Sequence, residues 1–299
     1  MNPYSFPRYL SAKRTVDDRA LNRPVWEALL NAFQPKDHPR ILEIGGGTGA
    51  MFQRLLEWGL LENGQYTLLD AEAENIAVAR QNLPAWGRQR GFTVTEDGDC
   101  LTFSTPAGRI RLDLVTADLF DFLARSSEHA APWDLLVAHA FLDLVDIPHT
   151  LPLLRGLLHP GSLLYLTINF DGLTAFEPVI DARLDEAILA LYHQSMDQRA
   201  AGGDSRSGRR LFTWLPQAGF EILAAGSSDW AVLPRRGAYP ADEAYFLNFI
   251  LHFFDLTLSG HPALAAEPFG EWLAARQAQL ERGQLVYLAH QFDFLAALI

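Results

Sequence analysis

The sequence predicts an α/β protein with a doubly wound, mostly parallel β-sheet, helices on both faces and an added helical lobe. Between residues 40 and 170, short apolar segments alternate with amphipathic ones, which is typical of βαβ units. A glycine run at residues 45–49 follows the first apolar segment, where a strand must turn sharply into a helix. The segment at 133–138 is continuously apolar, as expected for a strand covered on both faces.

The chain is predicted to begin with a helix at residues 15–33. Thr15 is the expected N-cap, because its hydroxyl can accept a hydrogen bond from the first turn, and acidic Asp17 and Asp18 favour a helix N-terminus. Apolar residues then recur at helical spacing, at Leu21, Val25, Leu29 and Phe33.

The alternating segments define the expected order of elements up to residue 170. A β-hairpin is expected at 92–111, ahead of the third main strand, because turn residues interrupt an alternating pattern there. Pro84 is predicted to end the second helix of the series. The expected strands lie at 40–44, 65–69, 111–116, 133–138 and 163–168, and the expected helices at 50–60, 73–83 and 151–158.

The second half of the chain is predicted to be mainly helical. Helical periodicity covers 176–200, 211–217, 241–258 and 269–281. Strand-like segments lie at 220–232 and 284–291. The helix at 245–254 is rich in phenylalanine, for which core packing is the first explanation and a homodimer interface or a pocket wall the second.

Composition excludes several classes of function. The net charge of −12 disfavours nucleic acid as a partner, because proteins that bind a phosphate backbone need a basic surface. No apolar run reaches the ~18 residues of a membrane span, and no secretory signal is recognised. Cys100 is the single cysteine, so neither an intrachain disulfide nor a thiolate zinc site is expected, and no metal is predicted. We therefore expect a cytoplasmic protein.

The glycine run and two carboxylates form the main candidate site. Gly45-x-Gly47-x-x-Ala50 also fits a dinucleotide fingerprint. Glu43, two residues before the first glycine, is awkward beside a pyrophosphate but suits a cationic ligand such as S-adenosylmethionine, which carries an ammonium and a sulfonium. Asp70 ends the next strand, 25 positions after Gly45, near the spacing expected for a carboxylate that binds ribose hydroxyls.

With these residues in place, the sequence resembles the class I, Rossmann-like S-adenosylmethionine-dependent methyltransferases. The acidic-x-Gly-x-Gly-x-Gly motif of the family matches residues 43–49, and its acidic second-strand end matches Asp70. The resemblance implies a seven-stranded sheet and a closing antiparallel strand around residues 285–290. It also implies that Asp118 binds the adenine amino group, with Leu119 or Phe120 covering the ring. The implied cofactor-binding residues are Glu43, Gly45, Gly46, Gly47, Gly49, Asp70, Ala71, Asp118, Leu119 and His139.

The resemblance also implies the layout of the domain. One methyltransferase domain is expected over residues 1–299, with a helical segment at 1–35 and a cofactor-binding core at 36–170. The helices of 171–210 and 238–282 are expected to be insertions on the substrate side.

The segment after the fourth strand differs from one branch of the family. It reads His139-Ala140-Phe141-Leu142 and lacks the Asn/Asp-Pro-Pro-aromatic tetrad of enzymes that methylate amino groups of bases and glutamine. This favours a small-molecule acceptor. His139 is the candidate catalytic base, since histidine titrates near neutral pH, although it could instead only line the pocket.

A substrate-binding helix face is expected in the first insertion. Tyr192, Met196 and Arg199 are spaced so that one face can carry all three. With Arg209 and Arg210 nearby, this face could orient an anionic or carbonyl acceptor, or it could be an amphipathic helix with solvated charges. Three other functions stay open: an NAD- or FAD-dependent oxidoreductase, a non-catalytic S-adenosylmethionine-binding protein and an RNA methyltransferase.

Overall fold

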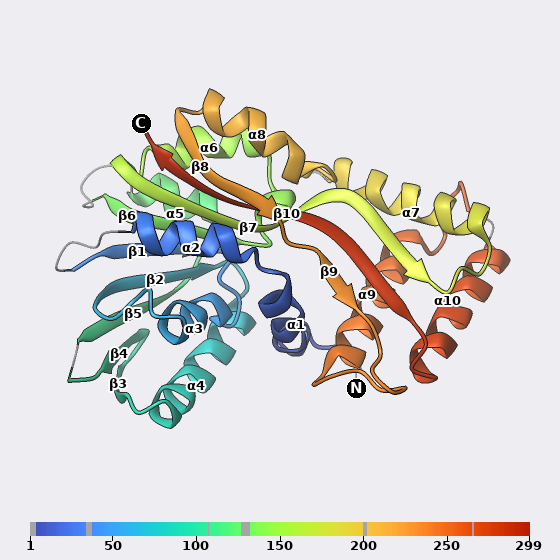
Figure 1. Ribbon diagram of the computed structural model, residues 1–299, viewed down its shortest axis with the longest axis horizontal. Helices are drawn as coiled ribbons and strands as arrows, with labels where there is room; N and C mark the ends of the chain where they lie inside the picture. Colours follow the sequence, from blue (N-terminus) through green and yellow to red (C-terminus); the bar gives the residue numbers. More distant parts are fainter. Residues whose placement is uncertain (1–3, 34–37, 107, 127–131, 200–201, 265) are drawn as a thin grey trace.

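The computed structural model contains one ten-stranded sheet in the order β3-β4-β5-β2-β1-β6-β7-β10-β8, with β9 paired to β10 (Figure 1). It describes residues 4–33, 38–106, 108–126, 132–199, 202–264 and 266–299. The strands are β1 (Arg40–Ile44), β2 (Gly64–Asp70), β3 (Thr93–Asp97), β4 (Cys100–Ser104), β5 (Arg109–Thr116), β6 (Trp133–His139), β7 (Leu158–Glu177), β8 (Phe220–Ser227), β9 (Trp230–Val232) and β10 (Val286–Leu298).

Seven of these strands form the sheet that the sequence predicts. Strands β5, β2, β1, β6 and β7 pair in parallel, while β10 runs antiparallel between β7 and β8. The hairpin β3–β4 and the short β9 supply the remaining three. The α/β fold class is therefore confirmed.

The helices are α1 (Phe6–Ala20), α2 (Arg23–Ala32), α3 (Ala50–Glu57), α4 (Ala73–Gln89), α5 (Leu119–Ser126), α6 (Ile147–Arg155), α7 (Ala182–Asp197), α8 (Ser207–Gln217), α9 (Glu243–Leu258) and α10 (Ala266–Glu281), with a 3₁₀ turn, η1, at Leu142–Leu144. No helix of the described ranges is long and apolar enough to cross a bilayer.

Two apolar cores cover the two faces of the sheet. Helices α2, α3 and α4 pack on one face, and α5, α6 and α8 pack on the other. In β6, Leu135 and Val137 point into the first core, whereas Leu136 and Ala138 point into the second. This division explains the unbroken apolar run of that strand.

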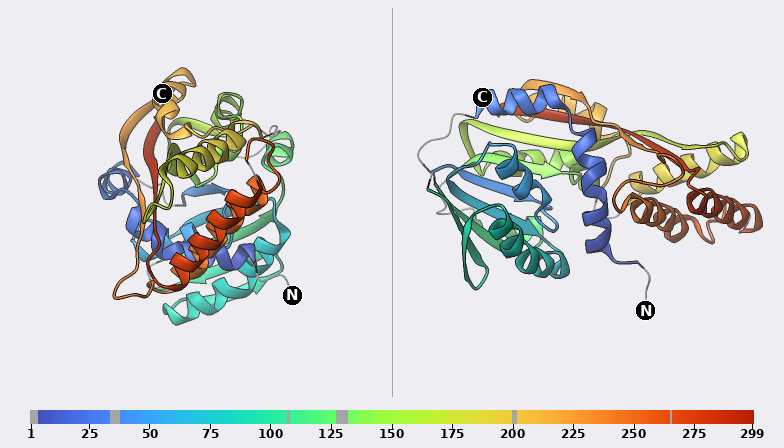
Figure 2. Two further views of the ribbon diagram at one scale, coloured as in Figure 1. Left: turned by 90° about the vertical axis from the view of Figure 1, so that its right-hand side faces the viewer. Right: turned by 60° about the horizontal axis from the view of Figure 1, so that its bottom comes forward.

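Strands β7 and β10 run beyond the sheet and carry a helical lobe of α7, α9 and α10 (Figures 1 and 2). The prediction that the fifth strand ends at residue 168 is wrong. Pairing with β10 continues to Glu177, opposite Val286, so the partner strand supplies hydrogen bonds beyond residue 168. Consequently residues 286–289 pair within this extension, and 291–297 close the core sheet.

The N-terminal prediction of one helix at residues 15–33 is also wrong, because two helices occupy the segment. Asn22 caps α2 by accepting a hydrogen bond from the Val25 N–H, and Pro24 lies in its first turn. Ser5 caps α1, and Thr15 lies mid-helix, where its hydroxyl donates to Glu243.

Pro84 does not end α4, which continues to Gln89. A proline inside a helix removes one backbone hydrogen bond, and tertiary packing offsets this loss. The following turn packs tightly on the β3–β4 hairpin: a Cβ added at Gly87 would lie 2.5 Å from Phe103.

Candidate active site

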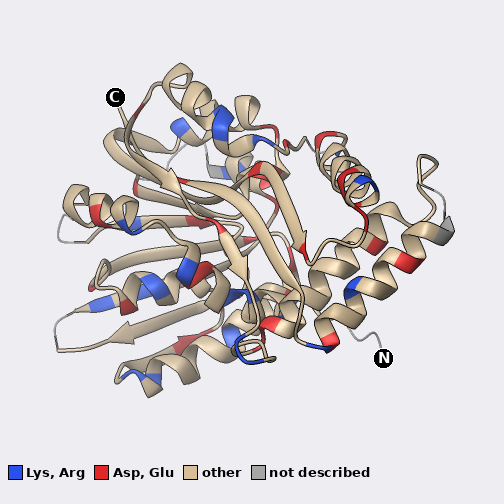
Figure 3. Ribbon diagram, turned by 45° about the vertical axis from the view of Figure 1, so that its right-hand side comes forward, with Lys and Arg blue, Asp and Glu red and all other residues tan. Residues whose placement is uncertain are grey.

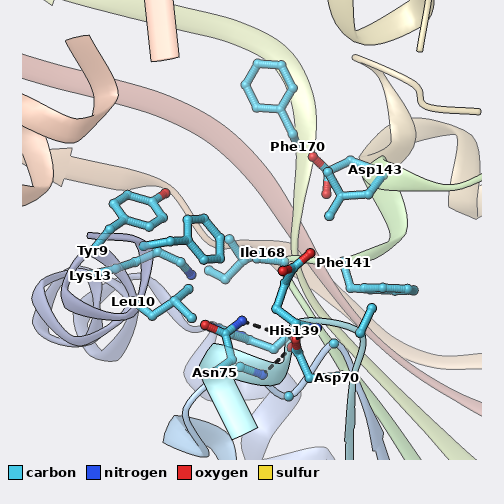
Figure 4. Close-up of a pocket in the computed structure, with 18 of the residues that line it drawn as sticks. Tyr9, Leu10, Lys13, Asp70, Asn75, His139, Phe141, Asp143, Ile168 and Phe170 are labelled. Atoms are coloured by element: carbon cyan, nitrogen blue, oxygen red, sulfur yellow. Dashed lines mark hydrogen bonds between the residues drawn. The ribbon is translucent and has the colours of Figure 1, made fainter. Parts of the chain in front are cut away.

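A cavity of about 910 Å³ lies between the sheet and the lobe (Figure 4). The carboxyl ends of β1, β2, β5 and β6 form its floor, and α1, α7 and α9 form its walls. In open α/β sheets, ligands bind outside the carboxyl ends of the strands, where the strand order reverses. Here the order reverses at β1, which lies between β2 and β6.

The glycine run makes the turn from β1 into α3. Gly45 and Gly47 adopt positive φ, +63° and +55°, in which other residues are strained. A Cβ added at Gly45 would lie 2.4 Å from the Phe141 ring, and one added at Gly46 would lie 2.6 Å from Leu68. These three glycines line the cavity, whereas Gly49 packs against Leu83 and starts α3.

Asp70 ties the ends of β1 and β2 together. Its carboxylate accepts hydrogen bonds from the backbone N–H of Gly47 at 2.8 Å, from that of Glu72 at 2.9 Å and from the side chain of Asn75 at 3.1 Å. The Asn75 carbonyl oxygen is buried and has no hydrogen-bond partner among the described residues. This corner of the cavity therefore combines a fixed carboxylate with an acceptor that a ligand hydroxyl can satisfy.

Glu43 is buried at the end of β1 and borders the cavity. Burial raises its pKa to about 8, although a 2.7 Å hydrogen bond from the Tyr66 hydroxyl opposes this shift. At neutral pH most Glu43 side chains are therefore protonated, and a cation placed beside them would favour the ionised form.

The far edge of the floor holds Ala71, Asp118, Leu119 and Phe120, all of which border the cavity. Asp118 is exposed, and its Oδ1 accepts from the backbone N–H of Phe120 and Asp121 at the start of α5. Leu119 is buried. The pair thus offers a carboxylate beside an apolar surface.

His139 lies at the end of β6 in a buried network. Its Nδ1 is 2.8 Å from the Thr167 hydroxyl, and its Nε2 is 2.9 Å from the Asp17 carboxylate of α1. Burial and the nearby Lys13 ammonium lower the pKa of His139 to about 4. Because both ring nitrogens are engaged, this geometry favours a role in positioning α1, and its role as a catalytic base stays a prediction.

Asp17 joins α1 to the floor of the cavity. It accepts from Lys13 at 2.6 Å and from the Trp230 indole at 2.9 Å. Burial alone would raise its pKa, but the Lys13 charge and the hydrogen bond from His139 outweigh burial and hold the pKa well below its usual range.

We predict that Asp17→Asn destabilises the protein by about 3–5 kcal/mol at neutral pH, because it leaves a buried ammonium without its partner. A carboxylate with a depressed folded pKa contributes stability that is present above its unfolded pKa and is lost as pH falls through the folded pKa. Denaturant unfolding from pH 7 down to pH 3 measures this: the gap between wild type and variant should narrow on acidification. A gap that stays constant would contradict the assignment.

The expected substrate-binding residues meet at the lobe side of the cavity. Tyr192, Met196 and Arg199 all line it. Arg209 and Arg210 do not, because they pair with Asp171 at 2.8 Å and Asp204 at 2.6 Å.

Three lining residues could not be found from the sequence. Asp143, in η1, has no motif around it, and its only signal is a position four residues beyond the end of β6. The other two lie on the extended strands, Phe170 on β7 and Tyr287 on β10.

Ile168 marks strained backbone at the centre of the cavity wall. Its φ is +58°, an outlier for a β-branched residue that costs about 1–3 kcal/mol. The Asp293 carboxylate accepts from its N–H at 2.8 Å and from that of Asn22 at 2.8 Å, and so holds this conformation. The strain aims the Ile168 side chain into the cavity (Figure 4).

Comparison with known proteins identifies the fold. No protein-family model matches the chain, and no curated protein matches it. Among solved structures, one described as a candidate type II methyltransferase from Anaeromyxobacter dehalogenans aligns with a TM-score of 0.50 and 15% identity, covering 92% of this chain and 96% of its own.

Two further structures are S-adenosylmethionine-dependent methyltransferases in complex with S-adenosylhomocysteine. The Thiobacillus denitrificans protein aligns with a TM-score of 0.48 and 13% identity over 99% of this chain and 100% of its own. The Geobacter sulfurreducens protein aligns with a TM-score of 0.46 and 12% identity over 99% of each chain. With the strand order of its sheet, the alignment to the Anaeromyxobacter structure shows that this chain shares the Rossmann-like fold of that structure.

Proposed function

We propose that the protein is an S-adenosylmethionine-dependent methyltransferase that acts on a small molecule. The observation that carries the proposal is the meeting of Gly45, Gly47, Asp70 and Glu43 in one cavity at the point of sheet reversal. The fold shared with a methyltransferase structure supports it.

The residues present fit S-adenosylmethionine. Asp70 and the unpartnered Asn75 oxygen suit ribose hydroxyls, and Asp118 with Leu119 suits adenine. Glu43 suits the ammonium group, because a nearby cation strongly stabilises the ionised form of a buried carboxyl group. A volume of about 910 Å³ lies near the upper end of the ~300–1,000 Å³ typical of ligand pockets, which leaves room for an acceptor as well.

The bound cofactor would supply a methyl group already activated by sulfonium. The protein's own task is then to hold the acceptor in line with that group, and fixed geometry of this kind can contribute ~7–11 kcal/mol. Helices α1, α7 and α9 line the cavity opposite the glycine turn, and this arrangement supports our proposal that the segments 171–210 and 238–282 lie on the substrate side.

Two alternatives make different predictions. A dinucleotide would place a pyrophosphate at the glycine turn, beside the buried carboxyl group of Glu43, whose ionised form would repel it. An RNA substrate needs a basic surface, but Lys and Arg are scattered over the elements in the view of Figure 3. Calorimetry with S-adenosylhomocysteine and NADH tests the proposal. Saturable binding of the first alone is expected, whereas NADH binding without it would contradict the assignment.

Binding of S-adenosylhomocysteine should release protons at pH 7. Glu43 has a folded pKa of about 8 and is mostly protonated there, so an ammonium placed beside it would lower that pKa and release up to one proton. Above pH 9 the group is already ionised and the release should fade. Calorimetry in two buffers of different ionisation enthalpy measures the release. Glu43→Gln should abolish this proton release. If the variant released as many protons as the wild type, the proton would come from a group other than Glu43.

A further inference from the structure

The lobe side of the cavity is an aromatic chamber. Its aromatic side chains come from six separate elements, the helices α1, α7 and α9 and the strands β7, β9 and β10. Phe253 and Tyr9 lie edge to face with ring centroids 5.4 Å apart. The aromatic lining residues of this chamber are Phe6, Tyr9, Phe170, Tyr192, Trp230, Phe253 and Tyr287. Such walls favour an apolar body, and the faces of aromatic rings also attract cations.

The charges that line the cavity are mainly negative. Seven carboxyl side chains border it, of which Glu43 is mostly protonated at neutral pH, against two cationic ones, Lys13 and Arg199. Lys13 is neutralised by Asp17 at 2.6 Å, and Arg199 is exposed to solvent, which screens it. An excess of charges of one sign in a low-dielectric cleft attracts ligands of the opposite charge. The cavity as a whole therefore favours cationic ligands.

Asp143 is the carboxylate that borders the chamber without an ion pair among the described residues. In the described part of the chain its carboxylate makes no ion pair and no hydrogen bond to another side chain, although Arg199 and Lys13 lie close enough to influence it. Burial raises the pKa of Asp143, and the nearby Arg199 charge and a hydrogen bond from the residue's own backbone N–H only partly oppose this shift. In Figure 4 it lies beside Phe170, with Tyr9 and Lys13 on the other side of the view.

We propose that the acceptor is a hydrophobic amine, whose apolar body fills the aromatic chamber and whose ammonium group binds beside Asp143. The ammonium gives one proton to the Asp143 carboxylate, and the free amine then attacks the methyl group as the bond from that carbon to sulfur breaks and S-adenosylhomocysteine leaves. This inference rests on the proposed methyltransferase function and specifies its substrate class. It differs from the anionic or carbonyl acceptor expected from sequence, because Arg209 and Arg210 are paired with Asp171 and Asp204 outside the cavity. An ammonium would give Asp143 the ion pair that it lacks, inside walls that add cation–π attraction.

Three probes of one shape test the charge preference: naphthylmethylamine, naphthylmethanol and naphthoate. Calorimetry measures their binding to the full-length protein, with and without saturating S-adenosylhomocysteine. The amine is expected to bind at least about tenfold more tightly than the alcohol, and the carboxylate most weakly. An amine that binds no more tightly than the alcohol, or a carboxylate that binds most tightly, would overturn the inference.

Asp143→Asn assigns the preference to one side chain. The amine should lose about tenfold in affinity, while the alcohol should bind as before, which also shows that the variant is folded. Asp121→Asn is the matched control, because Asp121 is an exposed carboxylate on α5 outside the cavity, and it should change neither affinity. An amine preference that survives Asp143→Asn would contradict the assignment to Asp143.

The results distinguish the proposed function from the proposed substrate class. If S-adenosylhomocysteine does not bind, the methyltransferase function is wrong, whatever the three naphthyl probes show. If S-adenosylhomocysteine binds but the amine is not preferred, the methyltransferase function is retained and only the amine substrate class is wrong.

Discussion

Replacing Gly47 by valine is expected to weaken S-adenosylhomocysteine binding at least about 100-fold, or by more than ~2.7 kcal/mol. Gly47 has a φ of +55°, a region that β-branched residues rarely adopt, and its Cβ would lie 3.0 Å from Leu10 of α1. The valine would also stand between the backbone and the ligand, where a close approach is needed. Calorimetry measures the loss.

Gly98 provides a matched control for backbone strain. Its φ is +59°, and a Cβ added there meets no atom within 4 Å. Gly98→Val should therefore cost stability in a similar way but leave the affinity for the nucleoside unchanged. If both variants lost binding equally, the effect of Gly47→Val would reflect unfolding rather than a blocked site, and thermal unfolding of each would show this.

Asp70→Ala is expected to reduce the same affinity about 100-fold. Each hydrogen bond to a charged group contributes ~1.5–3 kcal/mol, and Asp70 both holds the Gly47 N–H and, in our assignment, accepts from the ribose. Loss of the carboxylate would loosen the glycine turn and remove a ligand contact together. Titration with adenosine, which keeps the ribose but lacks the amino acid part, should show a similar loss.

Asp113→Ala controls for removal of a paired carboxylate from the same sheet. Asp113 accepts from Gln65 and Arg111 and lies outside the cavity. Its loss should leave nucleoside affinity unchanged. Adenosine that binds equally well to wild type and Asp70→Ala would place the ribose away from Asp70.

The core of the fold and one corner of the site follow from local sequence. A glycine run between a strand and a helix has few structural solutions, so the positions of Gly45, Gly47 and Asp70 could be predicted from spacing alone. The parallel strands follow for a similar reason, since apolar runs such as that of β6 fit only a sheet covered on both faces.

The rest of the site depends on contacts between distant segments. The length of β7 is set by its pairing with β10, which lies more than 100 residues later in the chain. The local sequence pattern at residues 169–177 does not predict this pairing. Asp17 reads as an ordinary first-turn acid, but it becomes a buried partner of His139, 122 positions away. Asp143 has no motif, and only the folding of α7 and α9 over β6 makes it part of a chamber.

A crystal structure of the protein with S-adenosylhomocysteine would show directly where the cofactor binds. We expect the nucleoside across the turn at Gly45–Gly47, with its ribose hydroxyls within hydrogen-bond distance of Asp70 and its sulfur facing the aromatic chamber. A nucleoside bound elsewhere, or one whose ribose lies away from Asp70, would contradict this expectation.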